Sequence, residues 1–259
     1  MDLLHPISGF LVGLMVGLTG VGGGSLMAPL MILLLGVAPA TAIGTDLWFA
    51  AITKMVGGTV HHNQGHADWQ VVRRLAWGSI PAALLTLWFL STTDAHQVKS
   101  GLIVQLLGAI LVVTAFATLL HKKIYTAAAR VDETRIHIYR KALPALTMLA
   151  GAILGVVVTL TSIGAGALGA TMLVMLYPLR MSTQKIVGTD IVHAVPLTLL
   201  AGLGHFWMGH VDLGLLGALL LGSIPGIIIG AKLTSRINAG MLRWALAAML
   251  FFSGIRLLA

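Results

Sequence analysis

Long apolar segments alternate with short polar ones along the whole chain. Most of them are close to the roughly 20 residues that an α-helix needs to cross a bilayer. The pattern therefore predicts an all-α polytopic membrane protein with about eight membrane segments, four in each half. These segments cover about residues 6–37, 43–60, 75–91 and 101–120 in the first half, and 142–179, 187–207, 213–231 and 241–258 in the second.

The two halves repeat the same motifs at a spacing of 144 residues. Between residues 44 and 81 and their counterparts, 14 of 38 positions are identical without a gap, whereas roughly two or three would match by chance. Two homologous halves in an apolar chain are typical of a duplicated membrane transporter, whose substrate lies where the halves meet. The repeated motifs are Gly44-Thr45-Asp46 with Gly188-Thr189-Asp190, His61 with His205, Gly65-His66-Ala67-Asp68 with Gly209-His210-Val211-Asp212, and Gly78-Ser79-Ile80-Pro81 with Gly222-Ser223-Ile224-Pro225.

Composition agrees with a membrane location. Hydrophobic residues make up 58% of the 259 residues and charged residues only 9%, and the mean hydropathy is +0.96. Soluble proteins carry about 25% charged residues, so this chain could not cover its surface in water. The net charge of +8 does not indicate nucleic-acid binding, because the basic residues lie between apolar segments, where they set membrane topology. The absence of cysteine excludes disulfides and thiolate metal sites.

The first apolar segment of each half is interrupted by small residues. Residues 19–25 read Thr-Gly-Val-Gly-Gly-Gly-Ser, and residues 161–166 read Thr-Ser-Ile-Gly-Ala-Gly. Each glycine destabilises a helix by about 1 kcal/mol relative to alanine, so we expect unwound backbone, which persists at membrane depth only inside protein or beside a cavity. The first segment has 32 residues, fewer than the about 40 that two full spans require. A re-entrant or incompletely spanning hairpin is therefore favoured.

Basic residues distinguish two possible topologies. If each broken segment crosses once, the halves are parallel and the basic residues divide nine to six between the two sides. If it enters and returns on one side, the halves are inverted and the division is thirteen to two. The positive-inside rule favours inverted repeats with both termini outside. The predicted organisation is an N-terminal membrane repeat (1–120), a basic cytoplasmic linker (121–141) and a C-terminal membrane repeat (142–259).

Both interruptions are candidate substrate sites. A helix that starts there presents free N–H groups and the positive end of its dipole, which bind an anion without a charged side chain. The alternative is that the small residues only let helices approach closely. The candidate substrate-binding residues are Thr19, Gly22, Gly23, Gly24, Ser25, Lys54, Thr161, Ser162, Gly164 and Gly166.

Lys54, Asp46 and Asp190 are charged residues within apolar segments. Lys54 lies eleven residues after Ile43, and Thr198 replaces it in the second half. A lysine at this depth faces protein, water or an anion, or extends its amine to the interface. Asp46 and Asp190 lie near the start of their segments, where an acid beside a threonine is typical of a helix N-cap. The other interpretation is a proton carrier or a coupling-ion ligand.

Histidines are the remaining candidates for chemistry. His61 and His66 recur in a turn that ends in an aspartate at the start of the next helix, where these residues suit the helix dipoles. No acidic or cysteine ligands complete a metal site, so we expect no metal and no cofactor. His193 is internal to a segment and is a candidate pore or proton residue. The predicted coupling or gating residues are Asp46, Asp190, His61, His205 and His193.

The arrangement of these motifs resembles the sulfite exporter TauE/SafE family, also called the toluene-sulfonate uptake permease family. A glycine-rich segment is followed by Ala-Ile-Gly-Thr-Asp at 42–46, His61, Ala-Asp-Trp at 67–69 and Gly-x-x-Pro at 78–81, and the set recurs. The resemblance covers essentially the whole chain and implies an inner-membrane secondary transporter for sulfite or organosulfonates. Many relatives have Gly-Thr-Ser in place of Gly-Thr-Asp, and often an arginine near His66, so the extra acids could change the coupling ion or the substrate.

We therefore expect a secondary transporter, not an enzyme, that carries a sulfur-containing anion by alternating access, with any proton coupling through Asp46, Asp190 or a histidine. The alternative is a passive channel or a metal-ion permease that uses the histidines. No Ser–His pair in a protease context and no paired metal-ligand motif within a span supports an enzyme. The expected partners are a small anionic substrate and membrane lipid, without nucleic acid. The oligomeric state and the direction of transport stay open.

Overall fold

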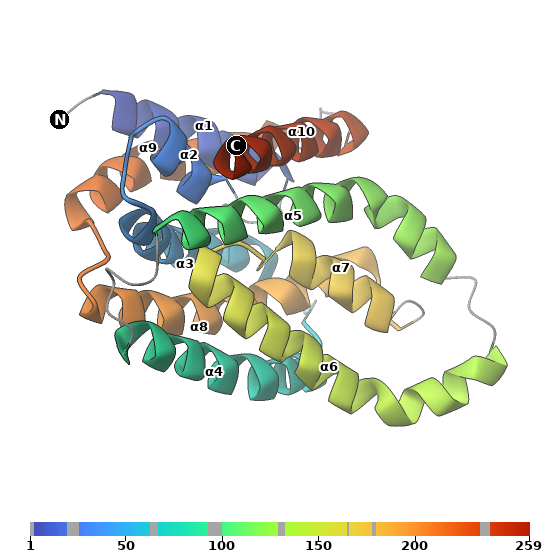
Figure 1. Cartoon of the computed structure of the whole chain (residues 1–259). Coiled ribbons are helices and arrows are strands. Elements are labelled where there is room, and N and C mark those ends of the chain that lie inside the picture. The colour runs from blue at the N-terminus through green and yellow to red at the C-terminus, as the bar shows by residue number, and fades with distance from the viewer. Residues whose placement is uncertain are drawn as a thin grey trace.

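A computed structural model shows long helices joined by short connections (Figure 1). It describes residues 3–19, 26–62, 67–92, 100–128, 133–164, 166–177, 180–233 and 239–259. These residues form ten helices and no strand. The helices are α1 (Leu4–Thr19), α2 (Met27–Leu33), α3 (Pro39–His62), α4 (Trp69–Thr92), α5 (Ser100–Ala128), α6 (Glu133–Thr161), α7 (Ala167–Leu176), α8 (Thr183–Trp207), α9 (Leu213–Leu233) and α10 (Ala239–Leu258).

The first apolar segment of each half forms two helices instead of one. α1 ends at Thr19 before α2 begins at Met27, and α6 ends at Thr161 before α7 begins at Ala167. α2 has 7 residues and α7 has 10, far short of the about 20 that cross a membrane. In Figure 1, α6 and α7 run in opposite directions. The expected interruption is therefore present in both halves.

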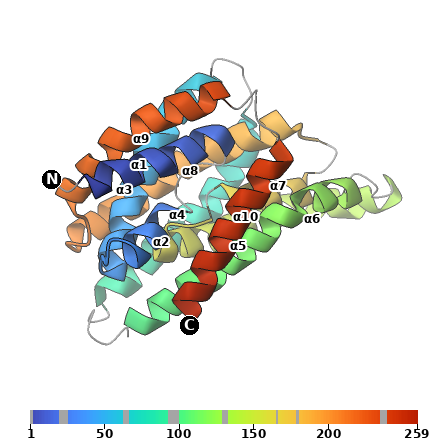
Figure 2. The ribbon, with the colours of Figure 1, turned by 90° about the horizontal axis from the view of Figure 1, so that it is seen from above.

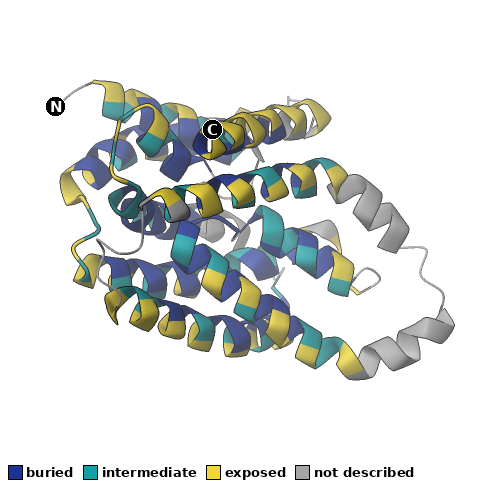
Figure 3. Ribbon diagram, viewed as in Figure 1, coloured by how far each residue is buried: buried dark blue, intermediate teal, exposed yellow. Residues whose placement is uncertain are grey.

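The exterior of the helices suits lipid. Within the described residues, five helices contain stretches that are long and apolar enough to cross a membrane, namely α4, α5, α6, α8 and α9. Shorter apolar stretches lie in α1, α7 and α10. Large apolar side chains such as Trp88, Phe89 and Phe252 are exposed. Exposed positions lie along the outward faces of the helices (Figure 3). An apolar surface of this extent is incompatible with water, so the fold is that of a polytopic membrane protein.

The helices of the two halves are interleaved. The first helix of each half packs along the third long helix of the other half, so that α1 lies against α9 and α6 against α4. The second helices, α3 and α8, pack together, and so do the last helices, α5 and α10. Figure 2 shows α1 beside α9 and α10 beside α5. Equivalent helices thus make equivalent contacts, as expected for a duplicated chain.

Glycines let two of these pairs touch backbone to backbone. A β-carbon on Gly222 of α9 would collide with the carbonyl oxygen of Pro6 in α1. A β-carbon on Gly78 of α4 would collide with the carbonyl oxygen of Met148 in α6. Both glycines open the repeated Gly-Ser-Ile-Pro motif. Small residues therefore allow close contacts between the halves, as they do between many membrane helices.

The equivalent helices α3 and α8 run in opposite directions. Gly44, near the start of α3, lies against the side chain of His205, near the end of α8. One turn further along α3, Trp48 Nε1 donates a 3.0 Å hydrogen bond to the carbonyl oxygen of Gly202, which precedes His205. Residues later in α3 therefore contact residues earlier in α8, so the two helices are antiparallel.

Helix continues into the predicted linker from both sides. α5 extends to Ala128 and α6 begins at Glu133. The polar composition of residues 121–141 thus does not end the helices, because a helix needs an apolar sequence to enter lipid but not to continue beyond it.

Candidate functional site

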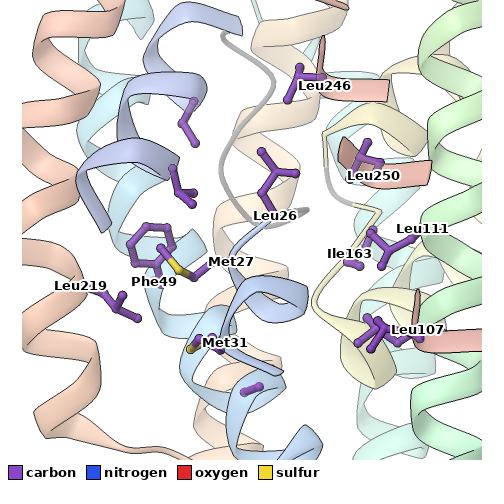
Figure 4. Packing of buried hydrophobic residues seen from close by; sticks show 14 of the residues in the cluster. Leu26, Met27, Met31, Phe49, Leu107, Leu111, Ile163, Leu219, Leu246 and Leu250 are labelled. Atoms are coloured by element: carbon purple, nitrogen blue, oxygen red, sulfur yellow. The ribbon is translucent and has the colours of Figure 1, made fainter. Parts of the chain in front are cut away.

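The residues that follow the first interruption share an apolar cluster with a residue of the second. Leu26 and Met27 follow the first interruption, and Ile163 lies in the second. All three belong to a cluster of buried side chains that includes Phe49 of α3 (Figure 4). Residues that follow the first interruption and a residue of the second therefore share one buried cluster with α3.

The second interruption has an unusual backbone. Ser162, Gly164 and Gly166 have φ angles of 59°, 117° and 134°. Residues other than glycine rarely adopt positive φ, so the two glycines are required and Ser162 is strained. The Thr161 hydroxyl is used locally, because it accepts a 3.2 Å hydrogen bond from the Ile163 N–H. The buried Ser162 hydroxyl, in contrast, has no hydrogen-bond partner within the described residues.

The first interruption itself lies outside the described residues. The predictions for Gly22, Gly23, Gly24 and Ser25 fall there. Thr19 is the last residue of α1, and its side chain is also outside the described part.

The prediction that Asp46 and Asp190 cap their helices is wrong. α3 begins at Pro39 and α8 at Thr183, so each aspartate lies seven residues into its helix, about two turns. The N-cap of α8 is Ser182, whose hydroxyl accepts a 3.3 Å hydrogen bond from a backbone N–H. The two aspartates therefore belong to the helix interior.

The capping aspartates are those of the repeated turn, as predicted. Asp68 Oδ1 accepts a 3.3 Å hydrogen bond from the N–H of Val71 at the start of α4. Asp212 Oδ1 accepts a 2.9 Å hydrogen bond from the N–H of Leu215 at the start of α9. Each side chain satisfies one of the free donors of its helix.

The threonines of the Gly-Thr-Asp motif join the two halves. Thr189 Oγ1 accepts a 2.9 Å hydrogen bond from the backbone N–H of Asp68. Thr45 Oγ1 accepts a 3.1 Å hydrogen bond from that of Asp212. The two bonds are equivalent under the repeat, and each anchors the helical turn that carries the buried aspartate.

Asp46 is completely buried and interacts with both the second interruption and the start of α2. Neither carboxylate oxygen has a hydrogen-bond partner in the described part of the chain. Asp46 interacts electrostatically with the hydroxyl of Ser162 and with the backbone N–H of Ala28, the second residue of α2. Neither contact has the geometry of a hydrogen bond to the carboxylate.

Lys54 lies within electrostatic reach of both aspartates. It is 4% exposed, which argues against the interpretation that its amine extends to the interface. Its ammonium group interacts with Asp190 and, more weakly, with Asp46. The Asp190 carboxylate lies against Gly169, where a β-carbon would collide with it. The Asp190 carboxylate therefore touches the second short helix, α7.

His193 adds a neighbour from α4. Its Nε2 atom lies 2.8 Å from Ser79 Oγ, and both side chains are buried. His193 also interacts electrostatically with Lys54. Sequence reasoning missed Ser79, although the repetition of its motif was a usable signal. We call the set Asp46, Lys54, Ser79, Ser162, Asp190 and His193 the central polar cluster.

The repeated histidines form a separate contact in the second half. His205 Nε2 lies 3.0 Å from the carbonyl oxygen of Thr159, and its ring centroid is 5.6 Å from that of His210. Partial burial lowers the pKa of His210. The side chains of His61 and His66 lie outside the described residues. No group of three metal-ligating side chains occurs among the residues that the structure describes.

An ion-paired group at the start of α4 was not predicted. Arg180 Nη2 donates hydrogen bonds to Asp68 Oδ2 at 3.0 Å and to Gln70 Oε1 at 2.9 Å. Lys185 Nζ lies 3.7 Å from Asp68 Oδ2. The first-half counterparts of the two basic residues are uncharged, so the repeat gave no signal for this group.

The fold and the buried charges define a polytopic membrane transporter. A family model described as sulfite exporter TauE/SafE matches residues 6–257. The chain belongs to this family, as its motifs predicted.

Curated relatives agree with this class. The chain is 38% identical to the probable membrane transporter protein YjnA of Bacillus subtilis, over 97% of this chain and 98% of the relative. It is 28% identical to the probable membrane transporter protein YdhB of the same organism, over 96% and 97%. It is 24% identical to the probable membrane transporter protein MJ0441 of Methanocaldococcus jannaschii, over 97% and 93%. No solved structure matches the chain.

Proposed function

We propose that this transporter carries a sulfur-containing anion, sulfite or an organosulfonate, across the inner membrane and has no enzymatic activity. The observation that carries the proposal is the burial of Lys54 within electrostatic reach of two aspartates, one of which interacts with Ser162 of the second interruption. A buried charge at membrane depth is expensive and is usually kept for transport. The description of the family as a sulfite exporter supports a sulfur oxyanion as the substrate.

The anion binds between the second interruption and α3. Ser162 offers a buried hydroxyl without a partner, and Lys54 offers a positive charge. The first N–H groups of α7 and its dipole favour negative charge at this end of the helix. Gly164 and Gly166 give the backbone its turn into α7. Thr19 and the residues at 22–25 supply equivalent groups from the first half.

Transport proceeds by alternating access between inverted repeats. The antiparallel packing of the equivalent helices α3 and α8 supports a two-fold axis in the membrane plane, as in other duplicated transporters. The exchange of first helices between the halves supports it as well, because α1 with α9 and α6 with α4 form two matching pairs. Movement of these pairs around α3 and α8 exposes the central polar cluster to each side in turn.

Proton coupling uses titratable side chains near the substrate. Asp46, Asp190 and His193 lie within the central polar cluster, so a proton on any of them changes the charge that the anion meets. His61 and His205 lie near the last turns of α3 and α8 and act as gating residues.

A histidine-based channel or metal-ion permease is the second candidate function. It is favoured by one observation, the buried Nδ1 atoms of His205 and His210, which have no hydrogen-bond partner within the described residues. Imidazole nitrogens of this kind are common ligands of zinc and nickel.

Ligand binding distinguishes the two functions. The purified protein in detergent is heated with sulfite, sulfate, thiosulfate, sulfoacetate or taurine, and an anion at about 100 times its Kd should stabilise it by about 2.7 kcal/mol. Lys54→Ala and Ser162→Ala should abolish the shift, whereas Lys232→Ala, which removes an exposed lysine, should retain it. Flux of the stabilising anion into proteoliposomes then tests transport. Stabilisation by Zn²⁺ or Ni²⁺ and by no sulfur anion would favour the histidine-based function instead.

A further inference from the structure

We propose that Asp46 is the proton-binding residue of this transporter, and that it has to be protonated before the anion binds, so that one proton accompanies each anion. The inference rests on the proposed function, because it concerns the same site. It assigns the proton to one of the two equivalent aspartates and gives the coupling a direction: proton and anion move together.

Asp46 differs from the other described aspartates in its surroundings. Asp68 and Asp212 accept hydrogen bonds from helix N-termini. Asp190 is the stronger electrostatic partner of Lys54. Asp46 alone has both carboxylate oxygens buried without a hydrogen-bond partner in the described part of the chain. An ionised carboxylate in such a place is strongly destabilised, whereas a protonated one is tolerated.

The ionised form of Asp46 competes with an anion. The groups within its electrostatic reach include the Ser162 hydroxyl and the Ala28 N–H, which are donors that an oxyanion would use. An anion at Ser162 would therefore lie beside a second negative charge, and like charges at short distance repel strongly where water is excluded. Protonation removes this charge and gives Asp46 an O–H donor. The same side chain thus changes from a competitor into a ligand.

A single proton balances the charges around Asp46. The groups that interact with it are Ser162, the Ala28 N–H and Lys54, and α8 adds Asp190 and His193 around Lys54. Among the described residues, α5 and α9, which also pack on α3, add no charged group to its interactions. With histidine counted as neutral, Lys54 balances Asp190 and leaves Asp46 as the one uncompensated charge. A proton on Asp46 makes the cluster neutral before the anion arrives.

Calorimetry on the full-length protein in detergent tests this coupling. Methanesulfonate and sulfate are suitable probes, because neither changes its charge between about pH 5.5 and pH 8. Titrations in buffers of different ionisation enthalpy give both Kd and the number of protons taken up. We expect a Kd that does not change with pH where Asp46 is already protonated and that rises about tenfold per pH unit on the alkaline side of its titration, where binding takes up about one proton per anion.

Two variants assign the proton to its residue. Asp46→Asn resembles the protonated carboxyl in shape and charge, so it should bind the anion without proton uptake, with a Kd constant within about twofold across the pH range. Asp212→Asn, a control at a capping aspartate far along the chain, should retain both the uptake and the pH dependence. The wild-type titration decides the coupling even if Asp46→Asn does not fold.

Three results would overturn the inference. Binding in the wild type without proton uptake and with an unchanged Kd across the whole pH range would overturn the coupling and leave the proposed anion transport intact. Proton uptake that persists in Asp46→Asn, or that is abolished in Asp190→Asn while Asp46→Asn retains it, would place the proton elsewhere. Failure of every sulfur anion to bind at any pH would overturn the proposed function, and the inference with it.

Discussion

Lys54→Met removes the ammonium group of the central polar cluster while keeping a long, flexible side chain. It leaves Asp46 and Asp190 buried without the cation that interacts with both. Loss of one partner from a buried ion pair destabilises a protein by about 3–5 kcal/mol. For a chain of this length each kcal/mol lowers the melting temperature by about 2–4 °C. We expect Lys54→Met to melt about 10 °C below the wild type, combining these two ranges.

A second substitution shows whether the loss comes from an uncompensated charge. Asp190→Asn added to Lys54→Met removes one unpaired carboxylate and should recover about half of the lost stability, which is a coupling well above 1 kcal/mol. Asp212→Asn added to Lys54→Met is the matched control and should recover nothing, because Asp212 caps α9 and does not face Lys54.

Thermal melting of the purified variants in one detergent, at one scan rate, measures the cycle. The reasoning fails if Lys54→Met melts within about 2 °C of the wild type, which corresponds to less than about 1 kcal/mol. It also fails if the two double variants melt at the same temperature, because the loss would then be one of packing and not of charge.

Three further predictions concern packing, the bonds between the halves and pH. Gly222→Ala should destabilise the protein by about 1–3 kcal/mol through overpacking. The control Gly217→Ala, in the same helix, meets open space and should be neutral or stabilising by up to about 1 kcal/mol. Equal melting temperatures of the two variants would contradict this prediction. Thr189→Val should cost about 1–3 kcal/mol, because the Asp68 N–H loses its acceptor, and hydrogen exchange of that amide should accelerate; unchanged protection would be evidence against the bond. Burial lowers the pKa of His210, so the unfolded chain binds more protons and stability falls as the pH drops below about 6.5. His210→Gln should weaken this fall, which melting temperatures of both proteins across that pH range would measure. Identical pH profiles of the wild type and the variant would contradict the prediction.

The sequence repeat predicted correctly those features that depend on residues close together in the chain. Asp68 and Asp212 were expected at helix starts because each precedes an apolar segment, and both cap helices. The same logic failed for Asp46, because hydropathy marks where a segment becomes apolar and not where the helix begins. The apolar segment begins near Ile43, but the helix begins at Pro39, where proline suits the first turn. Because the helix begins earlier than the apolar segment, Asp46 lies in the helix interior and not at its N-cap.

Contacts between distant segments could not be predicted from the pattern. The glycines indicated close packing, but the sequence does not say that Gly222 meets Pro6 of the other half. Ser79 was overlooked because a small hydroxyl in a membrane helix usually bonds its own backbone. Its partner, His193, lies 114 residues further along the chain, and only the folded arrangement brings the two together.

The pairing of α1 with α9 also determines when α1 can reach its partner during synthesis. α1 has a face shaped for direct backbone contact, but seven helices, α2 to α8, are made between it and its partner α9. α4, in contrast, meets α6 after only one intervening helix. α1 therefore stays in lipid without its partner while seven further helices are made. A nascent chain released before α9 presents that unpaired face to the bilayer and to proteases, as contacts between distant segments form last.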